Sequence, residues 1–266
     1  MQRNSLGQAI RMLILSIAFF ATALIYASVG FAGGSTYGAF MIIAEVDYRV
    51  LPSIVLCCNL IVVIGGSLRA TRRGLVDLRL VIPFTLLSAP MAWAGGRLPI
   101  DRGVFMLVLG MVLLASGLVM MARIPDQPPA DEMSRRRAWA IGLPTGALLG
   151  LVAGTVGIGG GVFLAPILHL TRLAGPRRIA ATASIFILVN SAAGLLGQTM
   201  KQGAFLQSEV LADFLPLFAA VFIGGQIGSH MGFAVLPARA LRVITAMLVI
   251  YGALRLLHSW LGMLGV

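Results

Sequence analysis

A succession of apolar stretches dominates the chain, at approximately 10–31, 34–44, 50–68, 79–96, 103–122, 139–170, 179–197, 209–236 and 240–263. Inside lipid, every backbone N–H and C=O group must be satisfied by the protein itself, which leaves only helices and closed barrels as spanning structures. The stretches have helical lengths and show no alternation of period two, which argues against a barrel. The sequence therefore predicts an all-α polytopic protein of the inner membrane, with about eight transmembrane helices.

The composition supports this class and limits the partners. Only 11% of the residues are charged, whereas a soluble domain carries about 25%. The formal net charge of +11 comes largely from arginines in short loops, as the positive-inside rule expects. We therefore expect a lipid bilayer and a small anionic substrate as partners, and no nucleic acid. The positive potential can also attract an anion.

Two halves are recognisable on either side of a polar segment. Residues 1–122 and 139–266 are each expected to form a transmembrane repeat of four segments, joined by a cytoplasmic linker at 123–138. Ser28-Val-Gly-Phe-Ala-Gly-Gly34 matches Thr155-Val-Gly-Ile-Gly-Gly-Gly161, 127 residues further on. Several weaker matches follow in the same order at nearly the same offset, which favours an internal duplication.

The placement of basic residues suggests that the two repeats are inverted. In the first half, Arg72 and Arg73 follow the long segment after the glycine motif, whereas in the second half Arg177 and Arg178 precede it. Positive charge marks the cytoplasmic side, so equivalent segments would cross in opposite directions, as in many secondary transporters. A parallel repeat with eight plain crossings is the alternative.

The glycine motifs predict two broken or re-entrant helices. The stretch 34–44 is too short to span, and the stretch 139–170 is too long for one simple crossing. A helix that begins inside the membrane presents free N–H groups to an anion, and nearby hydroxyls can cap it or bind the anion. The alternative is close helix packing by small residues.

Amides inside apolar runs are the second group of candidates. A buried amide can bind an oxyanion without carrying a charge, or it can join two helices by a hydrogen bond worth about 1 kcal/mol. Tyr37 can offer its hydroxyl to the same solute or lie at the membrane interface. The predicted substrate-binding residues are Ser28, Gly30, Gly33, Gly34, Ser35, Tyr37, Asn59, Thr155, Gly157, Gly159, Gly160, Gly161, Asn190 and Gln198.

The glycine motifs also carry a family resemblance. The string from Tyr26 to Tyr37, together with Thr155–Gly161, Pro166 and the string Phe-Ile-Leu-Val-Asn at 186–190, resembles the sulfite-exporter (TauE/SafE) family of membrane permeases. The first motif departs from the pattern: Phe31 stands where many relatives carry histidine, and Ala32 replaces a glycine. The resemblance implies export of small sulfur-containing or organic anions, such as sulfite, sulfoacetate or sulfolactate.

The functional expectation is a secondary transporter that works by alternating access. Coupling to a proton or sodium ion is left open, as is a homodimer. The sequence shows no catalytic set, and we expect no metal site and no cofactor. An integral-membrane enzyme or an assembly or scaffold protein without transport activity is the alternative.

Overall fold

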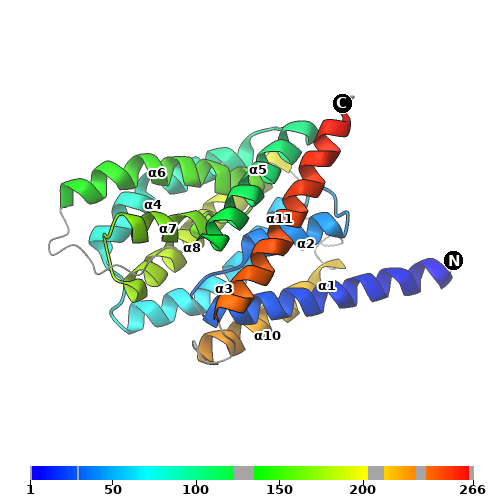
Figure 1. Cartoon of the computed structure of the whole chain (residues 1–266), viewed down its shortest axis with the longest axis horizontal. Coiled ribbons are helices and arrows are strands. Elements are labelled where there is room, and N and C mark those ends of the chain that lie inside the picture. Colours follow the sequence, from blue (N-terminus) through cyan, green and yellow to red (C-terminus); the bar gives the residue numbers. More distant parts are fainter. Residues whose placement is uncertain (1, 29, 123–134, 203–212, 232–237, 264–266) are drawn as a thin grey trace.

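The computed structural model of the chain describes residues 2–28, 30–122, 135–202, 213–231 and 238–263, and every regular element there is an α-helix (Figure 1). The helices are α1 (Gln2–Ser28), α2 (Gly34–Ile43), α3 (Leu51–Arg72), α4 (Leu78–Arg97), α5 (Arg102–Met121), α6 (Arg135–Val156), α7 (Gly161–Leu170), α8 (Pro176–Gln202), α10 (Leu215–Met231) and α11 (Ala238–Met263). Among the described residues, seven helices are long and apolar enough to cross a membrane. The predicted all-α polytopic fold is confirmed.

Both predicted helix breaks are present. The stretch 34–44 forms only the ten-residue helix α2, and the stretch 139–170 is divided into α6 and the ten-residue helix α7. Residues 123–134 of the predicted linker lie outside the described residues. Helix α6 begins at Arg135, inside the segment predicted as linker.

The two short helices begin and end in the same way. Each starts after a glycine in the left-handed conformation, Gly33 with φ 88° and Gly160 with φ 72°. Each ends in a Schellman motif, in which a left-handed residue follows the C-cap. That residue is Glu45 with φ 60° in α2 and Arg172 with φ 53° in α7, again 127 positions apart.

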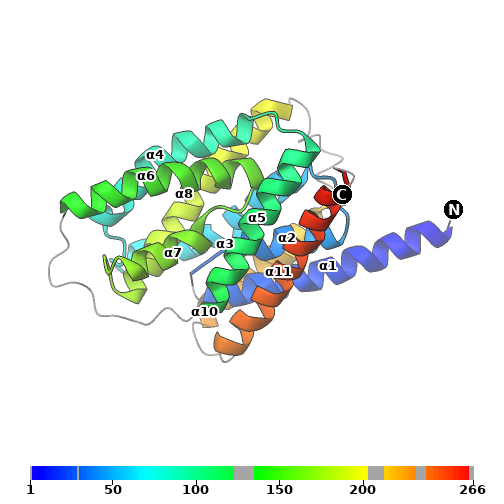
Figure 2. The same cartoon turned by 45° about the horizontal axis from the view of Figure 1, so that its top comes forward.

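Helices at corresponding places in the two halves run in opposite directions. Figures 1 and 2 show α1 running from right to left and α6 from left to right. Helices α3 and α8 are antiparallel, because Gly66 lies near Ser184 while Leu56 lies near Gly194. An ion pair of 3.6 Å between Asp77 and Arg178 joins the α3–α4 loop to the start of α8. That the two halves are homologous and inverted stays a prediction. Inverted repeats require corresponding helices to run in opposite directions, as α1 and α6, and α3 and α8, do here.

The halves interlock through glycine-rich helix contacts. Helix α6 lays Gly142, Gly146, Gly150 and Gly154, spaced every four residues, against α4. A Cβ atom at Gly154 would overlap the carbonyl oxygen of Ala92. Helix α10 approaches α1 similarly, because a Cβ atom at Gly228 would overlap the carbonyl oxygen of Leu24. Small residues allow this approach of backbones, so the first helix of each half packs on the fourth described helix of the other.

Gly154→Ala should destabilise the protein, although alanine favours a helix by about 1 kcal/mol over glycine. The added methyl group has no space against Ala92, and overpacking costs about 1–3 kcal/mol. The melting temperature in detergent should fall by several degrees. Gly262→Ala is the matched control, since nothing lies within 4 Å of a Cβ atom there. Equal melting temperatures for the two variants would contradict the packing described here.

Candidate functional site

The first break separates α1 from α2. Gly30 and Gly33 have φ values of 84° and 88°, in a region that side-chain-bearing residues rarely adopt. The backbone N–H of Phe31 still donates to the carbonyl of Tyr26, at 2.8 Å. Gly33 then begins α2 without any side-chain cap. In the first turn of α2, the N–H of Thr36 donates to the carbonyl of Gly33 at 2.9 Å. The N–H groups of Gly34 and Ser35 lie too early in the helix to have an intrahelical acceptor.

The second break separates α6 from α7. Gly157, Gly159 and Gly160 have φ values of 82°, 79° and 72°, so three of the motif's glycines turn the chain. Gly160 begins α7, again without a side-chain cap. Two helices therefore start inside the bundle with uncapped N–H groups, and the positive ends of their dipoles favour an anion.

The two breaks touch each other and are supported by opposite halves. A Cβ atom at Gly34 would lie 2.5 Å from the carbonyl oxygen of Ile158. The first break lies against α8, where the Ser184 hydroxyl donates to the carbonyl of Gly30. The second break lies against α3, where Gly157 adjoins the backbone of Pro52. Any movement of one half relative to the other must therefore change both breaks.

Asn59 lies between the breaks. A Cβ atom at Gly34 would be 2.8 Å from the Nδ2 atom of Asn59, and one at Gly159 would be 2.9 Å from the same atom. Asn59 is fully buried, with 0% of its surface exposed, and neither Nδ2 nor Oδ1 has a hydrogen-bond partner among the described residues. A buried polar group without a partner costs about 1–3 kcal/mol. The amide is therefore available to a ligand.

Ser191 adds a hydroxyl to the same place. It is buried, its Oγ atom has no partner among the described residues, and that atom would be 3.2 Å from a Cβ atom at Gly159. Sequence reasoning missed this residue and selected its neighbour Asn190. A serine in an apolar helix carries no signal of its own, because its hydroxyl often bonds within the helix.

The hydroxyls predicted beside the breaks do not cap the short helices. Ser28 donates to the carbonyl of Ile25 at 2.6 Å, and Thr155 donates to the carbonyl of Leu151 at 2.7 Å. Thr155 also lies beside Gly95 of α4. Ser35 is buried in the first turn of α2, the nearest of the predicted hydroxyls to the uncapped N–H groups.

The other predicted polar residues lie in helix contacts, and each keeps one buried atom without a hydrogen-bond partner among the described residues: the Tyr37 hydroxyl, Asn190 Nδ2 and Gln198 Oε1. The Oδ1 atom of Asn190 accepts from the Ser88 hydroxyl, which joins α8 to α4. The Nε2 atom of Gln198 donates to the carbonyl of Gly154 at 2.9 Å, which joins α8 to α6. Tyr37 is fully buried, and its ring stacks on Phe19 with the centroids 4.6 Å apart. Asn190 and Gln198 therefore form the interhelical hydrogen bonds that were the alternative to a role in binding an oxyanion.

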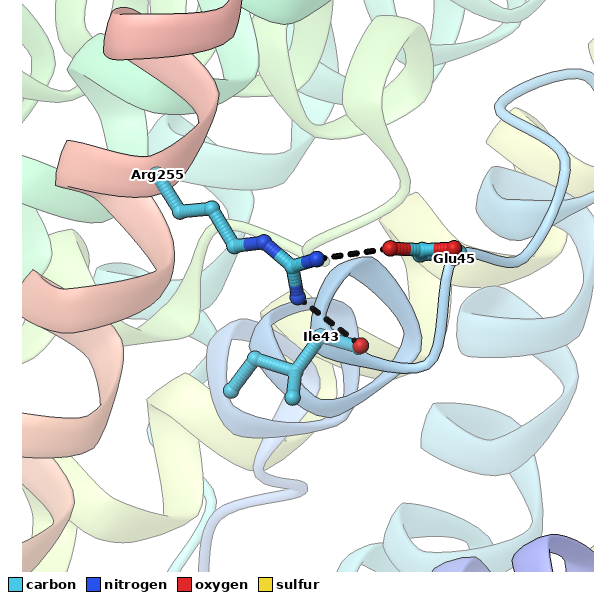
Figure 3. A network of polar contacts seen from close by, with 3 residues as sticks. All are labelled: Ile43, Glu45 and Arg255. Atoms are coloured by element: carbon cyan, nitrogen blue, oxygen red, sulfur yellow. Dashed lines mark hydrogen bonds and ion pairs between the residues drawn. The ribbon is translucent and has the colours of Figure 1, made fainter.

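The far end of α2 is held by an arginine of the second half. Figure 3 shows Arg255 of α11 between Ile43 and Glu45. Its guanidinium donates to the carbonyl of Ile43 at 2.9 Å and pairs with the carboxylate of Glu45 at 2.7 Å. A cation at a helix C-terminus interacts favourably with the helix dipole. Arg255 thus fixes the end of α2 opposite to the one that faces Asn59.

A model of the family described as sulfite exporter TauE/SafE matches residues 14–256, which include both breaks. The chain belongs to the sulfite exporter TauE/SafE family. A protein of Sinorhizobium fredii (strain NBRC 101917 / NGR234), described as probable membrane transporter protein y4hK, is 36% identical over 255 residues, which cover 91% of this chain and 97% of the relative.

Membership of the TauE/SafE family and the seven apolar spans make the chain a multi-pass membrane transporter. The predicted location in the inner membrane agrees with the bacterial relative. Among the described residues, no group of three histidine, cysteine, aspartate or glutamate side chains could hold a metal ion.

The two buried asparagines should respond differently to leucine in buffer without added oxyanion. Asn59→Leu removes no protein hydrogen bond, so the melting temperature should stay equal or rise. Asn190→Leu leaves the Ser88 hydroxyl without its acceptor, at a cost of about 1–3 kcal/mol, and should lower the melting temperature by several degrees. If Asn59→Leu lowered the melting temperature as much as Asn190→Leu, Asn59 would have a structural hydrogen-bond partner.

Proposed function

We propose that this chain is a secondary transporter that exports small sulfur-containing or organic oxyanions, such as sulfite, sulfoacetate and related sulfonates. The observation that carries the proposal is the buried, unpartnered amide of Asn59 between two uncapped helix starts. The Nδ2 atom of this amide can donate to an oxyanion together with backbone N–H groups and the hydroxyl of Ser191.

The charges around the site favour an anion over a cation. The acidic residues among the described positions are Glu45, Asp47, Asp77, Asp101 and Asp213, and all of them lie in loops or at helix ends. The described parts of the two breaks therefore contain no carboxylate that would repel an oxyanion. The description of the family as sulfite exporters supports the same choice of substrate, and it favours transport over a membrane enzyme or a scaffold.

The way in which the halves support each other favours alternating access as the mechanism. The first break rests on α8 and the second on α3, so a rocking movement between the halves would open the site to one side while closing it to the other. The proposal includes the inverted relation of the two halves, which this mechanism uses.

Sulfite should stabilise the purified protein against heat, and Asn59→Asp should remove that effect. A ligand at one hundred times its Kd adds about 2.7 kcal/mol. The substitution keeps the shape of the side chain but replaces the amide donor with a negative charge, which should weaken binding at least about tenfold. Sulfoacetate, thiosulfate, taurine and short carboxylates complete the screen.

Asn190→Asp is the matched control, because it makes the same chemical change at an equally buried amide on α8. Its effect on the sulfite-induced stabilisation should be several times smaller. Equal losses in the two variants would contradict the assignment of Asn59. Stabilisation by cations alone would contradict transport of an anion.

A further inference from the structure

A second unpartnered polar group lies further along α3. Arg69 follows Asn59 by ten residues, which is about 15 Å along a helix. Its Nη2 atom is buried and has no hydrogen-bond partner among the described residues. Among the described residues, its guanidinium forms no ion pair. Asp77, in the loop that follows α3, pairs with Arg178 instead.

The guanidinium lies over a glycine and beside an amide of the second half. A Cβ atom at Gly65 would be 3.0 Å from the Nη2 atom of Arg69 and 3.3 Å from the Nε2 atom of Gln226, on α10. Two nitrogen donors from α3 and α10 therefore approach the position beside Gly65, and the Oε1 atom of Gln226 lies 3.6 Å from the same point. A buried arginine donor without an acceptor is costly, and an oxyanion there would supply the missing acceptor and the opposite charge.

The charge around Arg69 also favours the binding of an anion there. Arg72 and Arg73 are exposed at the same end of α3, and both add positive potential. Such a basic helix end raises the local concentration of anions and accelerates their encounter with the protein.

Small and polar residues connect this end of α3 with the breaks. Gly66 comes seven residues after Asn59, almost two helical turns, so both lie on one side of α3. A Cβ atom at Gly66 would be 3.7 Å from the Oγ atom of Ser184, and that hydroxyl donates to Gly30 in the first break.

The contact of α3 with α10 is also looser than that of α4 with α8. A Cβ atom at Gly225 of α10 would meet Val62 at an ordinary 3.5 Å, whereas one at Gly197 of α8 would overlap the carbonyl oxygen of Trp93. Helices α3 and α10 therefore pack less closely at Gly225 than α4 and α8 do at Gly197.

We propose that Arg69 and Gln226 form a second oxyanion subsite, through which the transported anion reaches Asn59. This subsite rests on the proposed anion transport. It receives the anion first, and the central site then binds it between the two helix starts.

Counterflow of radiolabelled sulfite into proteoliposomes that contain the full chain tests the subsite. Arg69→Gln should raise the sulfite concentration for half-maximal uptake about tenfold, since a hydrogen bond to a charged group contributes about 1.5–3 kcal/mol. Arg79→Gln removes the same charge from an exposed position at the start of α4 and should change that concentration less than about twofold. Equal shifts in the two variants would overturn the subsite and leave the central site standing.

Gly65→Ala tests the same space while keeping the arginine. The added methyl group would lie 3.0 Å from the guanidinium and should shift half-maximal uptake in the same direction as Arg69→Gln, at an unchanged melting temperature without sulfite. Arg69→Lys, which keeps the charge but loses the planar fork, should give an intermediate shift. Unchanged uptake in Gly65→Ala would also overturn the subsite. An absence of sulfite uptake by the unsubstituted protein would overturn the proposed function itself.

Discussion

The structure depends on two helices that begin inside an apolar bundle. Lipid offers no partner to a backbone N–H group, so a helix start at this depth is tolerated only where protein or a bound solute satisfies it. Here Gly33 and Gly160 take left-handed conformations, and neither helix receives a side-chain cap. The protein thus brings two uncapped helix starts together and surrounds them with buried side-chain polar atoms that have no partner among the described residues. This combination is costly for stability and suited to binding an anion.

Packing between the halves holds these helix starts in position. Helices α1 and α6 reach their breaks along glycine-rich contacts with α10 and α4, while each break rests on a long helix of the opposite half. Arg255 fixes the other end of α2. Because neither half completes the site alone, the site is sensitive to the relative position of both. This dependence is the physical basis for proposing that movement between the halves controls access.

The sequence alone predicts much of this fold because hydrophobic length and glycine content are local signals. The apolar stretches predict the helices, and the two glycine motifs, 127 residues apart, predict the two breaks. Partners of individual side chains are a different matter, since they depend on contacts between distant segments. Asn59 and Asn190 look alike in sequence, yet both polar atoms of the Asn59 amide lie unpartnered between the breaks, whereas the Oδ1 atom of Asn190 accepts from Ser88 and only its Nδ2 atom has no partner among the described residues. Ser191 and Arg69 also became candidates only once the helices were placed.

The central claim is that an oxyanion occupies the space beside Asn59, and a heavier analogue of sulfite can be located directly. Selenite has the same shape and charge, and selenium gives an anomalous signal in X-ray diffraction. Crystals of the protein grown with selenite should show an anomalous peak within hydrogen-bond distance of the Asn59 amide, between the start of α2 and Gly159. Anomalous peaks for selenite only at other places, with protein atoms filling the space beside Asn59, would contradict an oxyanion site there.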